Sequence, residues 1–154
     1  MEWINGIVRA GYGVASGSGA DRRYPAGTIR MQQPFFLERG IDLSPYFPGT
    51  LNIDVAPKAP VPRRPIFDGL LRWYADIEER FLLSETEIEA SGKRYAGLWY
   101  YPHPQTKPAH VQADTVVELL MPWIPNLHAG DAVRVGLAQG VPEKVAKLVH
   151  KFRE

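Results

Sequence analysis

The sequence contains no cysteine. This absence excludes disulfides, thiolate metal sites and cysteine nucleophiles. Charge of either sign is not in excess, because 18 Lys and Arg residues balance 17 Asp and Glu residues, for a formal net charge of +1. A near-neutral chain attracts a nucleic-acid backbone or an acidic membrane surface only weakly, so we expect neither as a partner.

Long hydrophobic runs are missing as well. No apolar stretch approaches the roughly 20 residues that a membrane-spanning helix needs. The first residues also lack the basic and then apolar segments of a secretory signal. We therefore expect a cytoplasmic protein. The 154 residues, 45% of them hydrophobic, suit one globular domain over residues 1–154.

Glycine and proline, by contrast, are abundant at 14 each, which favours short strands joined by turns. Strand patterns begin at residue 4 and end near residue 137. They occur at residues 4–9, 50–55, 82–90, 93–102 and 113–123, and in an alternating strand through Val133, Val135 and Leu137, with turns at Ser91-Gly92 and at Ala129-Gly130-Asp131. This organisation predicts a mainly β fold, a small six-stranded β-barrel of the cradle-loop type with one or two peripheral helices. A split α+β domain is the alternative.

Two segments show the apolar spacing of an amphipathic helix. The first is residues 66–81, where the apolar positions are Leu70, Trp73, Tyr74, Ile77 and Phe81. The second is the C-terminal segment of about 142–153, which has Pro142 at its first helical position. Residues 34–40, "PFFLERG", fit either a helical turn or an irregular connection.

The segment "YFPGTLNIDV" places a Pro-Gly turn directly before a strand. Side chains alternate across a strand, so Thr50, Asn52 and Asp54 share the face opposite the apolar one. Thr50 and Asn52 offer neutral oxygen atoms in succession, and Mg²⁺ prefers hard oxygen ligands. Two neutral ligands leave most of the ion's charge uncancelled. An anionic ligand, such as a nucleotide's phosphates, would therefore complete the site. The alternative is the solvent face of an amphipathic strand.

Four glycines, at positions 11, 13, 17 and 19, follow the first strand. Backbone amides in such turns can converge on phosphate oxygens. The stretch is neither a dinucleotide fingerprint nor a P-loop, because the third glycine and the Gly-Lys-Ser/Thr triplet are missing. A flexible surface loop is the alternative.

Glu118 lies within an apolar strand, "VVELLM". A carboxylate in such surroundings needs a partner, or its face must be exposed. Tyr95, Trp99 and Tyr101 share one face of another strand, where they stack on a planar ligand or belong to the core.

These segments together resemble the archaeal CTP-dependent riboflavin kinases, which are small cradle-loop barrels. The likeness extends from about Ile4 to Leu137. The Gly-Thr-Leu-Asn motif carries it most specifically, and it is supported by "SGKRYAGLWYYP", "TVVELLMP" and "NLHAGDAVRV".

The resemblance implies a role for each matching position. Thr50 and Asn52 would hold Mg²⁺, and Glu118 would contact the flavin. His110 matches a second flavin-contacting position, at which the family has threonine. Asp54 and Glu118 are the candidates for a general base. The nucleotide-binding loop would comprise Gly11, Tyr12, Gly13, Val14, Ala15 and Ser16.

The implied reaction is phosphoryl transfer from a nucleoside triphosphate, CTP by resemblance, to riboflavin, giving FMN. The chain departs from the family pattern, in which a basic residue and an aromatic residue come soon after the glycine loop. Here the matching residues, Arg22, Arg23 and Tyr24, come several positions later. The family's basic, cytosine-recognising segment is also replaced here by the short and uncharged "WIPNL". A non-catalytic nucleotide- or flavin-binding barrel and a DNA-binding barrel are the rival hypotheses. The chain would be a monomer or a homodimer.

Overall fold

The computed structural model describes residues 1–11, 28–104, 106 and 113–138. They form seven strands and one helix: β1 Glu2–Gly11, α1 Thr28–Glu38, β2 Leu51–Asp54, β3 Phe67–Tyr74, β4 Ile77–Ala90, β5 Lys93–Pro102, β6 Val116–Leu120 and β7 Ala132–Leu137. Within these ranges, α1 falls short of the length and apolarity that crossing a membrane requires. The predicted C-terminal helix lies outside the described residues.

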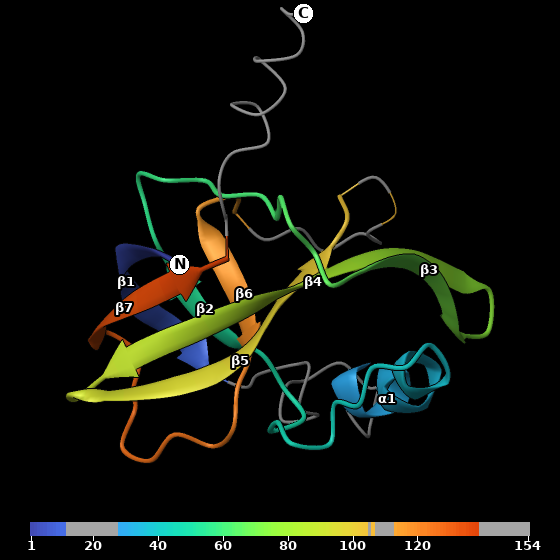
Figure 1. Ribbon diagram of the computed structural model, residues 1–154, viewed down its shortest axis with the longest axis horizontal. Coiled ribbons are helices and arrows are strands. Elements are labelled where there is room, and N and C mark those ends of the chain that lie inside the picture. Colours follow the sequence, from blue (N-terminus) through green and yellow to red (C-terminus); the bar gives the residue numbers. More distant parts are fainter. Residues whose placement is uncertain (12–27, 105, 107–112, 139–154) are drawn as a thin grey trace, which may run out of the picture.

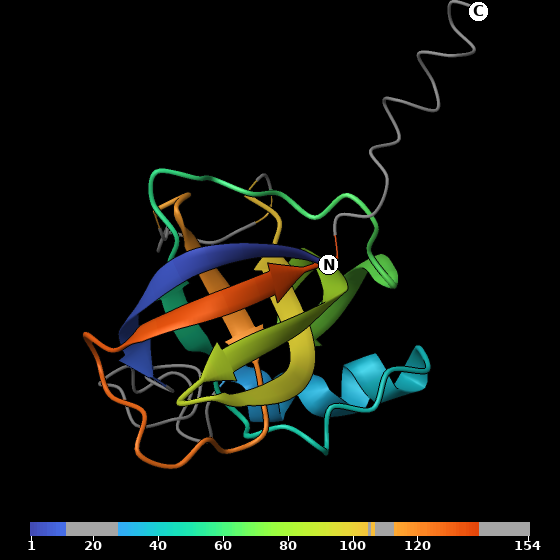
Figure 2. The same cartoon turned by 60° about the vertical axis from the view of Figure 1, so that its left-hand side comes forward.

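Six of the strands close an antiparallel barrel in the order β4-β5-β6-β2-β1-β7 (Figures 1 and 2). The barrel closes where β7 pairs with the second half of β4, from Thr86 to Glu89. The first half of β4 pairs instead with β3, which extends the sheet beyond the barrel. The prediction of a mainly β, six-stranded barrel is confirmed, and the alternative of a split α+β domain is wrong.

Alternation along the strands divides the buried apolar residues into two clusters. One cluster fills the barrel and includes Leu51 and Ile53 of β2 and Val117 and Leu119 of β6. The other lies outside the barrel wall, between α1 and the outer faces of β3 to β6. α1 contributes Ile29 and Phe36 to it. One stretch of the barrel's outer surface is therefore covered by α1 and not by solvent.

The predicted helix at residues 66–81 is wrong, because this segment forms β3, a turn and the start of β4. Leu71 and Trp73 are buried, whereas Leu70 and Tyr74 of the supposed apolar stripe are exposed. The turn at Ala75, which has a φ of 43°, separates the two strands. Apolar residues from both faces of two strands thus imitate the spacing of one helix.

The structure contains the turns predicted from the sequence. The turn between β4 and β5 is at Ser91 and Gly92, which have φ values of 50° and 77°. The turn before β7 contains Gly130, with a φ of 96°. Glycine is favoured at such positions because it lacks the Cβ that makes positive φ costly. The segment "PFFLERG" is mostly helical, since residues 34–38 complete α1.

Candidate functional site

Three polar side chains form a row across the outer face of the barrel. Asn52 of β2 is directly opposite Glu118 of β6, and Glu118 is directly opposite Tyr100 of β5. Directly opposed residues of an antiparallel sheet place their Cβ atoms about 4.5–5.5 Å apart on the same face. We call Asn52, Glu118 and Tyr100 the polar row. It brings a predicted metal ligand and the predicted flavin contact side by side.

α1 covers the Tyr100 end of the polar row. The Tyr100 hydroxyl donates a hydrogen bond of 2.8 Å to Oε1 of Gln32, and both side chains are buried. Close by, the buried Glu79 accepts a 3.1 Å hydrogen bond from the Trp73 indole. Burial, followed by the charges of Glu79 and Glu118, raises the pKa of Tyr100 well above its ordinary value. The phenol therefore stays neutral and keeps its proton for Gln32.

Replacing Tyr100 with phenylalanine should lower the free energy of unfolding by about 1–3 kcal/mol at neutral pH, because Gln32 Oε1 would remain buried without its donor. A phenol whose folded pKa is raised stabilises the fold fully below its unfolded pKa of about 10. That contribution is lost as the pH rises from there toward the folded pKa. Denaturant titrations above pH 10 should therefore show a steeper loss of stability in the wild type than in Tyr100→Phe. Parallel curves for the two proteins would contradict this expectation.

Thr50 and Asn52 lie at the other end of the polar row, where Thr50 is buried and Asn52 is half-buried. Thr50 is only 3% exposed. Asn52 Oδ1 is buried and, within the described part of the chain, is the one buried side-chain polar atom without a hydrogen-bond partner. A simple solvent face does not describe Thr50 or the Oδ1 atom of Asn52, although Asn52 and Asp54 as whole residues are half-buried. An unpartnered buried oxygen costs about 1–3 kcal/mol, which makes it a candidate ligand for a cation.

No cluster of three or more His, Cys, Asp or Glu side chains with metal-binding geometry occurs in the described ranges. A divalent ion at Thr50 and Asn52 would therefore meet two neutral oxygens from these positions. Mg²⁺ usually keeps several waters and has few protein ligands, most often carboxylates, together with the phosphates of its substrate. The residues present fit such a shared site, and the metal assignment stays a prediction.

The start of the glycine stretch lies beside this motif. β1 pairs with β2 so that Gly11 is opposite Leu51 and residue 10 is opposite Asn52. The register of β1 shifts between residues 8 and 10, as in a β-bulge. The remaining predicted nucleotide-binding positions, Tyr12, Gly13, Val14, Ala15 and Ser16, lie outside the described residues, as does His110.

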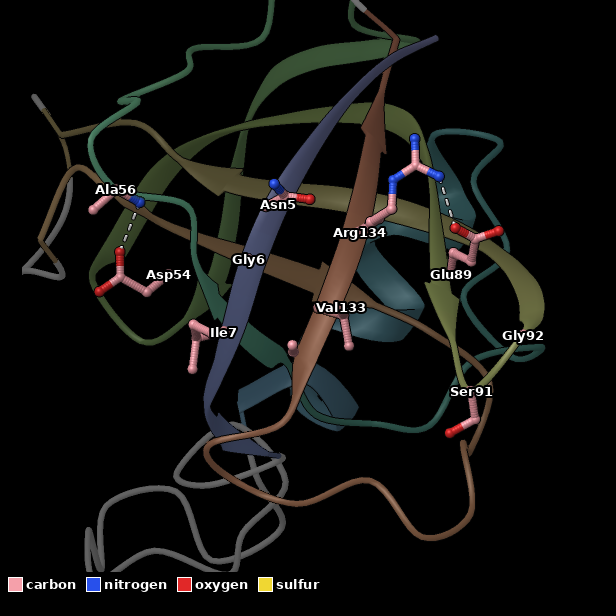
Figure 3. A pocket seen from close by; sticks show the side chains of 11 residues that line it. Asn5, Gly6, Ile7, Asp54, Ala56, Glu89, Ser91, Gly92, Val133 and Arg134 are labelled. Atoms are coloured by element: carbon pink, nitrogen blue, oxygen red, sulfur yellow. Dashed lines mark hydrogen bonds and ion pairs between the residues drawn. The ribbon is translucent and has the colours of Figure 1, made fainter.

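Asp54, the other candidate base, has two partners of its own. Its carboxylate is 3.1 Å from Nη1 of Arg9, and it accepts a 3.0 Å hydrogen bond from the backbone amide of Ala56. In Figure 3 its side chain points toward the Ala56 amide. Asp54 is thus bound to Arg9 and to the Ala56 amide at the end of β2. Glu118, by contrast, lies directly opposite Asn52.

A second feature of the outer surface is an open hollow of about 750 Å³ over β1, β7 and the end of β4 (Figure 3). The ion pair between Arg134 and Glu89, 2.8 Å long, lies on its wall, and Asp54 is at its rim. The hollow includes no member of the polar row. It therefore lies apart from the polar row and shares with the candidate site only Asp54.

Of the three aromatic residues predicted as either core or stacking surface, Trp99 and Tyr95 belong to the core, whereas Tyr101 is half-buried and its ring contacts those of Trp99 and His103 edge-on. Trp99 is 1% exposed inside the barrel, and Tyr95 packs against the same cluster. Neither is available to a ligand on the outer face. Sequence reasoning missed Gln32 and Tyr100 as members of the site. No local signal identifies them, because their hydrogen bond joins positions 68 residues apart.

No protein-family model matches this sequence, and a comparison with curated proteins finds no match either. What the site can do therefore follows from its own residues and geometry.

Proposed function

We propose that this protein is a phosphotransferase that makes FMN from riboflavin and a nucleoside triphosphate, with Mg²⁺ held by Thr50 and Asn52. The observation that carries the proposal is the buried, unpartnered Oδ1 of Asn52. It is adjacent to the buried Thr50 and next to the point where β1 leads into the glycine stretch. These are the places at which the resemblance puts the ion and the triphosphate.

The polar row supplies the acceptor side of the site. Glu118 is opposite Asn52, so a riboflavin hydroxyl bound by Glu118 would be next to the phosphates held at Thr50 and Asn52. Mg²⁺, when bound, neutralises the phosphate charge that builds up during transfer. Gln32 and Tyr100, joined by their hydrogen bond, fix the far end of the row, and the chain's main contribution is positioning.

The transfer is a single displacement at the γ-phosphorus. The primary hydroxyl at the end of riboflavin's ribityl chain loses its proton to a carboxylate, and we assign this base to Glu118. The new O–P bond forms to the γ-phosphorus, and the bond from that phosphorus to the nucleoside diphosphate breaks. FMN and the diphosphate leave. We place the reaction in the cytoplasm, where both substrates are available.

Product analysis tests the proposal directly. The protein is incubated with riboflavin, Mg²⁺ and each of CTP, ATP, GTP and UTP, and FMN is separated and quantified by its fluorescence. We expect FMN to form with at least one donor and to disappear when EDTA removes the ion. Absence of FMN with all four donors would contradict the kinase assignment.

The same samples separate the kinase from a non-catalytic binding module. A ligand that binds only the folded state raises its melting temperature, by an amount that depends on concentration and affinity. Stabilisation by a nucleotide or by riboflavin without any FMN would favour the binding module.

A further inference from the structure

β3 forms the free end of the sheet. Its residues, Phe67–Tyr74, pair with β4 on one side, and no described strand lies on the other side. In Figure 1 the hairpin of β3 and β4 projects from the barrel, above α1. A free strand edge presents N–H and C=O groups that pair readily with a strand of another chain. The edge of β3 is therefore a surface at which this sheet can be extended.

Backbone hydrogen bonds show which residues of β3 face the free edge. Leu70 is directly opposite Arg80. The Arg80 amide donates to Oγ1 of Thr106, and its carbonyl oxygen accepts a bond from the amide of His103, so both groups point away from β3. Leu70 and Arg80 are therefore a pair without mutual hydrogen bonds, and the backbone groups of Leu70 point away from β4. Because this direction alternates along a strand, residues 68 and 72 face the free edge as well.

The exposed side chains of this segment form a pattern that is complementary to itself. Every second side chain is exposed, and in order these are Ile66, Asp68, Leu70, Arg72 and Tyr74. The three apolar members are 50%, 46% and 39% exposed. An acidic and a basic residue lie at equal distances on either side of Leu70. If the segment is turned end to end about Leu70, each charge falls on the position of the opposite charge, and each apolar residue falls on an apolar one.

We propose that the free edge of β3 binds β3 of a second copy of this chain in antiparallel orientation, about a two-fold axis at Leu70. Leu70 is then opposite the partner's Leu70, and Asp68 is opposite the partner's Arg72. Ile66 is level with the partner's Tyr74. Opposite charges and apolar residues that face each other across two strands stabilise their pairing. The two copies form one continuous sheet, joined by an interface that uses the same surface of each copy.

Ion pairs within each copy explain why a second copy fits this edge. Asp68 accepts two 2.8 Å hydrogen bonds from Arg80, and Nη2 of Arg72 is 3.9 Å from Glu78. In the dimer, a row across the interface therefore contains Arg80, Asp68, the partner's Arg72 and the partner's Glu78, and the sign of the charge alternates along it. Exposed ion pairs contribute little energy, so these charges mainly determine the register and the orientation of the partner.

Arg39 keeps this association weak. Its Nη2 atom donates a 2.7 Å hydrogen bond to the carbonyl oxygen of Leu70, which is the acceptor at the centre of the interface. A charged side chain at a strand edge is a common protection against uncontrolled pairing. The paired segment is also short compared with the roughly 20–30 residues that each side of a standard interface contributes. We therefore expect a dimer in exchange with monomers. Arg39→Ala should strengthen it, because the Leu70 carbonyl loses a competing donor.

Sedimentation equilibrium over a concentration series up to the millimolar range tests the pairing. The average mass of the wild type should rise from that of a monomer toward that of a dimer. Asp68→Arg should stay monomeric, and so should Arg72→Asp, because each variant places like charges opposite each other on both sides of Leu70. An equimolar mixture of the two variants should dimerise, since every opposed pair in the mixed dimer again has opposite signs. Pairing about Leu70 specifically predicts this rescue.

Asp114→Arg is the matched control, because it makes the same charge change at an exposed aspartate that precedes β6. It should associate like the wild type, and urea titrations should show that each variant is folded. A wild type that stays monomeric throughout the series would overturn the proposal. A mixture that remains monomeric would overturn it too, as would a single charge variant that dimerises like the wild type. Should a charge variant unfold, the wild-type series and Arg39→Ala still decide, because weaker association of Arg39→Ala would mean that the copies meet at another surface.

Discussion

Replacing Asn52 with alanine should lower the rate of FMN formation by at least about 100- to 1,000-fold, the loss typical of removing one group that stabilises transition-state charge. The fold should not suffer from the same change. Asn52 Oδ1 is buried without a partner, so its removal relieves a desolvation cost of about 1–3 kcal/mol. We therefore expect a free energy of unfolding equal to or above that of the wild type. Activity and stability would change in opposite directions, as expected of a residue retained for function.

Steady-state rates and urea titrations of the same preparation check both expectations. The Mg²⁺ concentration needed for half-maximal stabilisation by nucleotide should also rise in Asn52→Ala. Asn5→Ala is a matched control, because Asn5 is an exposed asparagine on β1. Full activity in Asn52→Ala would exclude the metal assignment. Loss of activity together with several kcal/mol of stability would make Asn52 a structural residue instead.

The second large effect is expected at Glu118. Glu118→Gln should lower turnover by about 10²- to 10⁴-fold, the usual contribution of a positioned general base. Glutamine keeps the size of the side chain and its ability to accept a hydrogen bond, but it cannot take the proton of the riboflavin hydroxyl. The affinity for nucleotide should stay within a few-fold of the wild type, because Glu118 is assigned to the acceptor side.

Asp54→Asn is the natural comparison, because it makes the same chemical change two residues beyond Asn52. Asp54 is already engaged by Arg9 and by the Ala56 amide. The ion pair with Arg9 is exposed on the arginine side, and such pairs contribute about 0–1 kcal/mol. We expect Asp54→Asn to keep turnover within about tenfold of the wild type, well below the loss that a general base causes. The reverse ranking of the two variants would transfer the role of base from Glu118 to Asp54.

Some of this molecule could be predicted from the sequence alone, because the causes are local. Alternation in "TLNID" and "VVELL" determines which residues of β2 and β6 enter the barrel. Glycine at positions 92 and 130 marks two turns at positive φ. The same local argument failed at residues 66–81, where a turn at Ala75 joined two strands whose combined spacing matched a helix.

The candidate site, by contrast, depends on contacts between segments that are distant in the sequence. Alternation predicted that Thr50 and Asn52 share a strand face, but it could not distinguish an exposed position from a buried one. Only the tertiary structure decided the difference, because the surroundings of Asn52 come from distant segments: Glu118 from β6 and, beyond it, Tyr100 under Gln32 of α1. Burial depends on what covers a surface, and here the cover comes from parts of the chain that no local pattern relates.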